Sequence, residues 1–303
     1  MPILLTLLLS LLVLPFASAY APVAQLLQIH SSTISQLKLD PRTSPLPSDP
    51  PLSSPDFFYL RHILEYDEGI EEDDEGGINL LSGIQNTLAW RRGDGLEIVM
   101  SASSAIEEAR KDGGWNNEPV LTAAPHSLKI TNYITGKQII TTSSKQGDLI
   151  YCIRAGSIDD NSLMSTCTVP ELIEFFLYAK EINTQIADER SLLTGRYTRI
   201  ITANDLSGVN VFGDASFRKA LSASSTIASK VYPAVNGPTL LLNLPKLLSA
   251  LVKLFKPIFP VSVQKKLRFA QGPLKGIGDL SDVARGGEVR EKFLKEIEEL
   301  IKD

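Results

Sequence analysis

Short apolar runs alternate with segments of helical period from Thr131 to the end of the chain, and this alternation constrains the fold more than any other feature. The strands expected from it are 148–154, 199–203, 239–244 and 266–270. Between them lie segments of helical period, one led by Pro170 and one stopped by Tyr232-Pro233. A chain that alternates in this way builds a sheet covered by helices, so the sequence predicts an α/β fold.

A helical subdomain is predicted ahead of this unit. Phe57, Leu60 and Leu64 fall on one helical face, and a second apolar period runs over 80–88. The acidic run 65–75 separates the two. Its carboxylates do not alternate around a glycine as in a calcium-binding loop, so we interpret it as a solvated charge run.

The N-terminus is typical of a targeting sequence. Residues 3–16 are apolar but too short for an ordinary membrane span, and Ala17-Ser18-Ala19 follows them as a signal-peptidase pattern. Residues 20–55 are rich in serine and proline without a sustained period, which predicts a disordered transit peptide or linker. The junction at Tyr20 resembles the bipartite plastid-targeting motif, which prefers phenylalanine there. We expect delivery to a plastid through the secretory pathway, with secretion or the endomembrane lumen as the alternative.

The domain boundaries expected from these patterns are 1–19 for a signal peptide, 20–55 for the disordered segment, 56–118 for the helical subdomain, 119–285 for the α/β unit and 286–303 for a last amphipathic helix.

Composition and motifs argue against several function classes. A net charge of -5 disfavours a nucleic-acid partner, because phosphate-binding domains carry a basic excess. Cys152 and Cys167 stand in no paired motif, which indicates buried thiols rather than a disulfide framework or zinc site. His-Glu-x-x-His and Gly-x-Ser-x-Gly are missing from the sequence, and residues 276–278 are only a fragment of a dinucleotide loop. We therefore expect no catalytic residues, no metal and no cofactor.

Four motifs stand in a fixed order along the second half of the chain. They are Asp205-Leu206-Ser207-Gly208, Tyr232-Pro233, Leu241-Leu242-Asn243-Leu244-Pro245 and Phe255-Lys256-Pro257. In order and spacing this set resembles the CRAL-TRIO (Sec14-like) lipid-binding domain. The resemblance implies a helical N-terminal subdomain, followed by a mixed sheet flanked by helices that enclose an apolar pocket.

The resemblance also implies a lid helix over the pocket, which the helical period places at 246–259. The candidates for lid and pocket are Leu247, Leu251, Leu254, Phe255, Ile258, Tyr151 and Phe176. The candidates for contact with a lipid headgroup are Lys256, Tyr232 and Ser207. Phosphoinositide-binding members carry a glutamate directly after Tyr-Pro, where this chain has Ala234, so phosphatidylinositol is not the ligand we expect.

Basic residues gather in one stretch of the chain. Between Asp214 and Asp279 there is no acidic residue and there are ten Lys or Arg residues. Such segregation favours transient docking on an anionic membrane, with Lys253, Lys265, Lys266 and Arg268 as the docking candidates. The alternative is that these bases pair with the acidic N-terminal run inside the fold.

Two functions follow from this sequence. The first is a monomeric carrier that transfers or presents a lipid or another lipophilic small molecule between membranes. The second is a scaffold or regulatory protein that keeps the fold without exchanging a lipid. A filled pocket behind the lid favours the carrier, whereas bulky side chains that plug it favour the scaffold.

Overall fold

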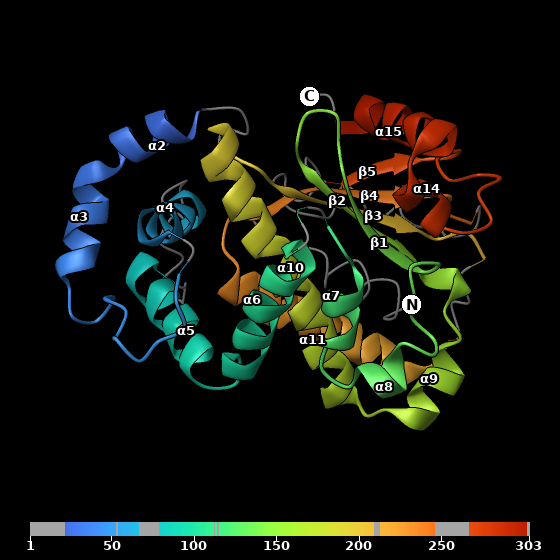
Figure 1. The fold of residues 1–303 in the computed structure, drawn as a ribbon, viewed down its shortest axis with the longest axis horizontal. Helices are drawn as coiled ribbons and strands as arrows, with labels where there is room; N and C mark the ends of the chain where they lie inside the picture. The colour runs from blue at the N-terminus through green and yellow to red at the C-terminus, as the bar shows by residue number, and fades with distance from the viewer. Residues whose placement is uncertain are drawn as a thin grey trace.

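The computed structural model describes residues 22–52, 54–66, 79–111, 113, 115–208, 213–245 and 267–301. The N-terminal part is helical, with α2 (Val23–Ile29), α3 (Ser31–Leu39), α4 (Pro55–Tyr66), α5 (Leu80–Arg92) and α6 (Leu96–Arg110). The short helices α7 (Glu118–Thr122) and α8 (Ser127–Ile130) lead into the α/β unit. In Figure 1 the helices α2 to α5 lie on the left and the sheet on the right, with α10 (Val169–Thr194) between them.

The sheet has five strands in the order of the sequence: β1 (Ile139–Ser143), β2 (Leu149–Arg154), β3 (Ile200–Asp205), β4 (Asn236–Leu242) and β5 (Leu267–Ala270). β1 pairs with β2 in antiparallel fashion, and the remaining pairs are parallel. The mixed α/β fold predicted from the sequence is confirmed. β1 was not predicted, because its sequence Ile-Ile-Thr-Thr-Ser carries only two apolar residues.

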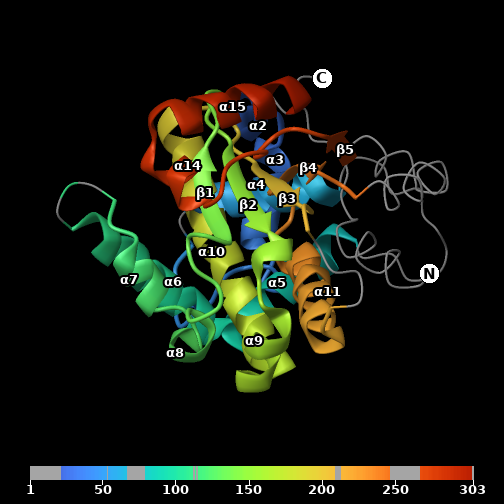
Figure 2. The ribbon, with the colours of Figure 1, turned by 90° about the vertical axis from the view of Figure 1, so that its right-hand side faces the viewer.

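Helices cover both faces of this sheet. α9 (Asp160–Thr166), α10 and α11 (Ala215–Val231) lie on one side, and α14 (Ser281–Arg285) and α15 (Gly287–Ile301) on the other. Figure 2 shows the layers, with α15 at the top, the strands below it, and α9 and α11 at the bottom. The C-terminal amphipathic helix thus has the packing surface that its apolar period required, because Phe293, Ile297 and Ile301 are buried against the strands.

The long helix α10 has clear start and stop signals. Thr168 caps the first turn, and its backbone and Glu171 complete a capping box, which satisfies amides that the helix leaves free. Gly195 ends the helix in the left-handed conformation, with φ of 69°, which glycine adopts without a steric penalty. The helix that Pro170 was expected to lead is therefore confirmed.

The segment 20–55 was predicted to be disordered, and this is wrong for the part that the structure describes. α2 and α3 form there, and Val23, Leu26, Ile34 and Leu37 are buried against α4. The serines that suggested disorder lie largely on the solvent side, whereas the apolar residues recur at helical spacing. Whether the segment also acts as a transit peptide stays a prediction.

The acidic run 65–75 was predicted to be solvated along its whole length, and this is wrong for its first residue. Glu65 lies in the last turn of α4 with only 2% of its surface exposed. Its carboxylate accepts a hydrogen bond of 2.7 Å from the backbone N–H of Ala234. A buried carboxylate needs such a partner, and the sequence did not show that a residue so distant supplies it.

Candidate functional site

The two faces of the central strands differ in how completely they are covered. On the side of α14 and α15, two positions of β2 and two of β3 have no exposed surface: Ile150, Cys152, Ile201 and Ala203. On the side of α10 and α11, Leu149 and Ile200 at the strand starts are buried, and the positions that follow them on this side are only half-buried: Tyr151, Ile153, Thr202 and Asn204. Parallel strands in an α/β fold are ordinarily covered on both faces. We call these four half-buried residues the open face of the sheet.

Aromatic side chains stand over this side of the sheet. Phe176 of α10 and Phe217 of α11 meet edge to face, with ring centroids 6.4 Å apart. Tyr151 packs against the same core from the strand side. Burial raises the pKa of Tyr151 far above the usual 10, with a smaller effect of Cys152, so the phenol stays neutral and able to donate a hydrogen bond. An apolar ligand with a small polar group matches such surroundings.

A cavity of about 510 Å³ lies at the carboxyl ends of the parallel strands. It is lined by Arg154, Ser207, Asn243, Gln271, Gly272, Leu274, Lys275, Gly276 and Ile277. Ligands of open α/β sheets often bind at this edge.

The polar groups of this cavity are largely engaged with one another. Asp205 accepts hydrogen bonds from Arg154 Nε at 2.9 Å and from Asn243 Nδ2 at 3.0 Å. Asn243 also donates to Pro273 O, and Arg154 donates to Gly278 O. Asn243 has φ of 53°, a conformation that asparagine tolerates better than most residues. These hydrogen bonds hold the loop 271–278 against the carboxyl ends of the strands.

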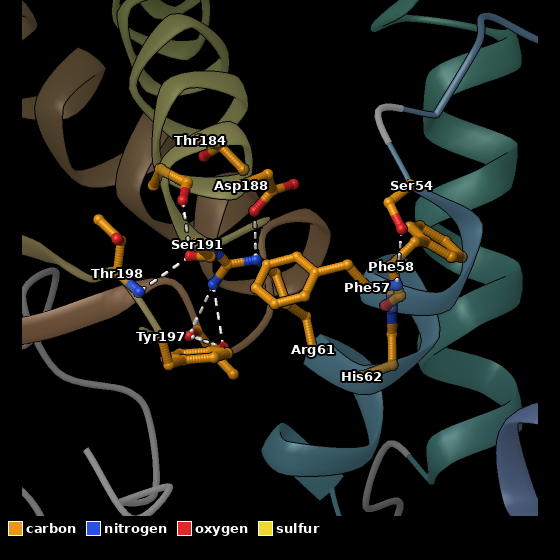
Figure 3. A network of polar contacts seen from close by, with 12 residues as sticks. Ser54, Phe57, Phe58, Arg61, His62, Thr184, Asp188, Ser191, Tyr197 and Thr198 are labelled. Carbon is orange, nitrogen blue, oxygen red and sulfur yellow. Dashed lines mark hydrogen bonds and ion pairs between the residues drawn. The ribbon is translucent and has the colours of Figure 1, made fainter. Parts of the chain in front are cut away.

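A second polar cluster joins the helical N-terminal part to the α/β unit, as Figure 3 shows. Arg61 of α4 donates to Asp188 Oδ1 of α10 at 2.5 Å and to the hydroxyl of Tyr197 at 2.9 Å. It also donates to Ala234 O at 3.1 Å, and Tyr197 donates to the same oxygen at 2.6 Å. Burial raises the pKa of Asp188 despite the nearby Arg61. The cluster fixes the turn after Tyr232-Pro233 to α4.

Tyr232 itself lies in the core rather than at an opening. It is 3% exposed, its hydroxyl lies 3.4 Å from Leu177 O, and Trp90 stands edge-on to its ring. Burial, followed by the neighbouring carboxylate of Glu181, raises its pKa well above 10. Arg91 Nη1 lies 3.2 Å from Glu181 Oε1, so this phenol borders a second buried ion pair.

The structure does not bring the predicted headgroup residues together. Tyr232 precedes β4, whereas Ser207 follows β3, which runs parallel to β4. The two residues lie at opposite ends of strands about 20 Å long, so one headgroup does not contact both. Lys256 lies outside the described residues, as do the lid candidates Leu247, Leu251, Leu254, Phe255 and Ile258 and the docking candidates Lys253, Lys265 and Lys266.

The remaining predicted residues are distributed over both faces. Tyr151 and Phe176 belong to the same core cluster, on the side of α10 and α11. Arg268 of β5 is paired with Leu240, whose side chain lies on the side of α14 and α15. The sequence did not single out Asn204 or Arg61, although a polar residue at an inward strand position is a signal that could have found Asn204.

His62 is packed inside the helical N-terminal part. His62 is 1% exposed and hydrogen-bonded through Nδ1 to Phe58 O and through Nε2 to Thr87 Oγ1. Burial lowers its pKa to about 4. Within the part of the chain that the structure describes, no group of His, Cys, Asp or Glu could hold a metal ion, and no helix is long and apolar enough to cross a bilayer.

Comparison with known families gives one match within the sequence. Residues 134–277 match the family model of the CRAL/TRIO domain. We call this stretch the CRAL/TRIO region, and it spans all five strands together with α9, α10 and α11. This match supports the resemblance seen in the sequence motifs.

No curated protein matches the chain. Among solved structures, one entitled "Crystal structure of Sfh5" is similar at 15% sequence identity and a TM-score of 0.46, over 84% of this chain and 81% of that chain. At this level of similarity nothing about function transfers.

Proposed function

We propose that the protein binds a lipophilic small molecule on the open face of the sheet and transfers or presents it between membranes. The observation that carries the proposal is the half-buried side of β2 and β3 within the CRAL/TRIO region, where Ile153 and the ring of Tyr151 lie in the same core cluster as Phe176 and Phe217. The proposal includes a lid over this face at 246–259, with Lys256 as a contact for a polar headgroup. The face supplies a low-polarity surface that an acyl or prenyl chain prefers to water.

The strength of such binding follows from the hydrophobic effect. Each CH₂ group removed from water contributes about 0.8 kcal/mol. Ten methylene groups buried between the strands and the helices thus contribute roughly 8 kcal/mol before the entropy of association is subtracted. This is enough to keep a water-insoluble molecule on a carrier, and weak enough to release it at a membrane.

Lipid extraction and mass spectrometry of the purified protein test the proposal. We expect one class of lipophilic molecule at close to one per chain. The variant Thr202→Trp places a large side chain on the open face and should lower recovery of the lipid. Thr226→Trp, at an exposed position of α11, is the matched control and should leave recovery unchanged.

A protein that yields no lipid, and takes up none from vesicles, would not be a carrier. The scaffold function would then remain.

Docking on an anionic membrane is the second part of the proposal. Reversing the charge of Lys253, Lys256, Lys265 and Lys266 should abolish co-sedimentation with vesicles that contain phosphatidylglycerol, because each surface base contributes on the order of 1 kcal/mol. The control variant reverses four exposed lysines on other elements, Lys111, Lys137, Lys292 and Lys295. It changes the net charge by the same amount and should still co-sediment. Equal loss in both variants would point to net charge alone and refute a docking site.

We also propose delivery to a plastid through the secretory pathway. A fluorescent protein fused behind residues 1–55 should collect in the plastid of an alga with secondary plastids. Secretion of the fusion would contradict this.

A further inference from the structure

The side chain of Asn204 is not satisfied within the fold. Its amide nitrogen Nδ2 is buried and has no hydrogen-bond partner among the residues that the structure describes. The great majority of buried side-chain donors in native proteins are paired with protein or water. An unpaired donor on a functional face therefore needs an explanation.

The residues in register with Asn204 on the neighbouring strands are apolar. In the register of the sheet, it stands between Ile153 of β2 and Leu241 of β4, and Leu241 pairs in turn with Phe269 of β5. Thr202 lies two residues earlier on the same face, opposite Tyr151. Asn204 thus offers a neutral donor between two aliphatic side chains, with the hydroxyl groups of Thr202 and Tyr151 further along the same face and no charged residue at the positions in register with it.

Alternation along β3 shows that this polar residue is not required by the strand itself. Ile201 and Ala203 fill the opposite face completely, and Ile200 begins the side of α10 as an apolar residue. Burying an unpaired amide beside such residues destabilises the fold, whereas leucine has nearly the same size and carries no polar group. The position is therefore explained better by a ligand than by packing.

We infer that Asn204 determines which ligand the protein binds: its amide donates a hydrogen bond to a neutral oxygen of the ligand, such as a ketone or quinone carbonyl. This inference rests on the proposed function and narrows its ligand class. A pure hydrocarbon leaves the donor unpaired, and a ligand with a carbonyl at the right depth satisfies it. In apolar surroundings this difference amounts to about tenfold in affinity.

Matched probes test the inference. Heptadecane and its 2-, 5- and 9-ketones have the same chain length and differ only in the presence and depth of one carbonyl group. Each is delivered from cyclodextrin, and its affinity is measured by displacement of the dye 1-N-phenylnaphthylamine from the whole protein. For at least one ketone we expect Asn204→Leu to weaken binding about tenfold, while binding of heptadecane is unchanged or stronger.

Two controls keep the result interpretable. Asn117→Leu, at an exposed position before α7, should alter no affinity. Asn204→Leu should unfold at the same temperature as the wild type or a higher one, because it removes an unpaired buried donor. A clearly lower unfolding temperature would show that the amide is bonded within the fold, and would overturn the inference.

The two possible failures are distinct. If dye, ketones and heptadecane all fail to bind, the proposed function is wrong and the inference fails with it. If they bind, and Asn204→Leu shifts ketones and heptadecane alike, the ligand does not use the amide. Only the inference is then refuted, and the binding face stands.

Discussion

Removing the carboxylate of Asp188 should destabilise the protein severely. Asp188 is the acidic partner of Arg61, whose side chain is 4% exposed and lies between the rings of Phe57 and Tyr197 at 4.8 and 4.9 Å. In Asp188→Ala the guanidinium stays buried without its counter-charge. Breaking a buried pair in this way costs about 3 to 5 kcal/mol. For a chain of this size, that loss lowers Tm by roughly 10 °C.

The assay is thermal and urea-induced unfolding followed by circular dichroism. Glu108→Gln breaks the exposed pair with Lys111 and should change the free energy of unfolding by less than about 0.5 kcal/mol. The double variant Arg61→Met/Asp188→Leu removes both charges and should lose less stability than Asp188→Ala alone. A loss below about 1 kcal/mol in Asp188→Ala would mean that Arg61 finds water or another partner, and would refute the reasoning.

Two further predictions concern a buried histidine and an alanine with a positive φ angle. Burial lowers the pKa of His62 from 6.5 to about 4. Below pH 6.5 the unfolded chain takes up a proton at this residue that the folded chain does not. The free energy of unfolding is therefore unaffected above pH 6.5 and falls by about 3 kcal/mol as the pH drops towards 4. His62→Gln should reduce this acid-induced drop in urea titrations, whereas Asn117→Gln, at an exposed position that carries no titratable group, should not. Ala234 has φ of 47° and is 8% exposed, so Ala234→Gly should be neutral or slightly stabilising. Ala234→Val should lower the free energy of unfolding by about 2 kcal/mol in the same assay, because a β-branched residue adopts a positive φ angle with difficulty. An unchanged urea midpoint would show that the backbone at this position is not strained.

The elements of the α/β unit could be predicted because each carries its own local signal. β2 is apolar up to Arg154, β4 ends in Leu240-Leu241-Leu242, and α10 has Pro170 at its start and a regular apolar period. β1 lacks such a signal, since threonine and serine fill most of it. α2 and α3 were missed because serine content was given more weight than the spacing of Leu26, Ile34 and Leu37.

The candidate site was predicted only in part. Tyr151 and Phe176, which the family resemblance singled out, belong to one core cluster on the side of α10 and α11, and their role as pocket residues stays a prediction. Contacts between distant segments leave no periodic trace in one sequence, so Arg61 could not be paired with Asp188, which is 127 residues further along the chain. For the same reason the separation of Tyr232 from Ser207 became evident only from the parallel strands.

The packing of α2 and α3 restricts how the N-terminus could be processed. The N–H of Val23 bonds to Gly195 O at the end of α10, and Leu26 and Leu37 close one side of the core that contains Phe57. A protease that removed residues 20–55 after folding would uncover that core. A protease that removed them before folding would leave α4 without its cover from the start. Cleavage on the N-terminal side of Val23 therefore leaves all of this packing intact, whereas cleavage after it removes part of the cover of the core.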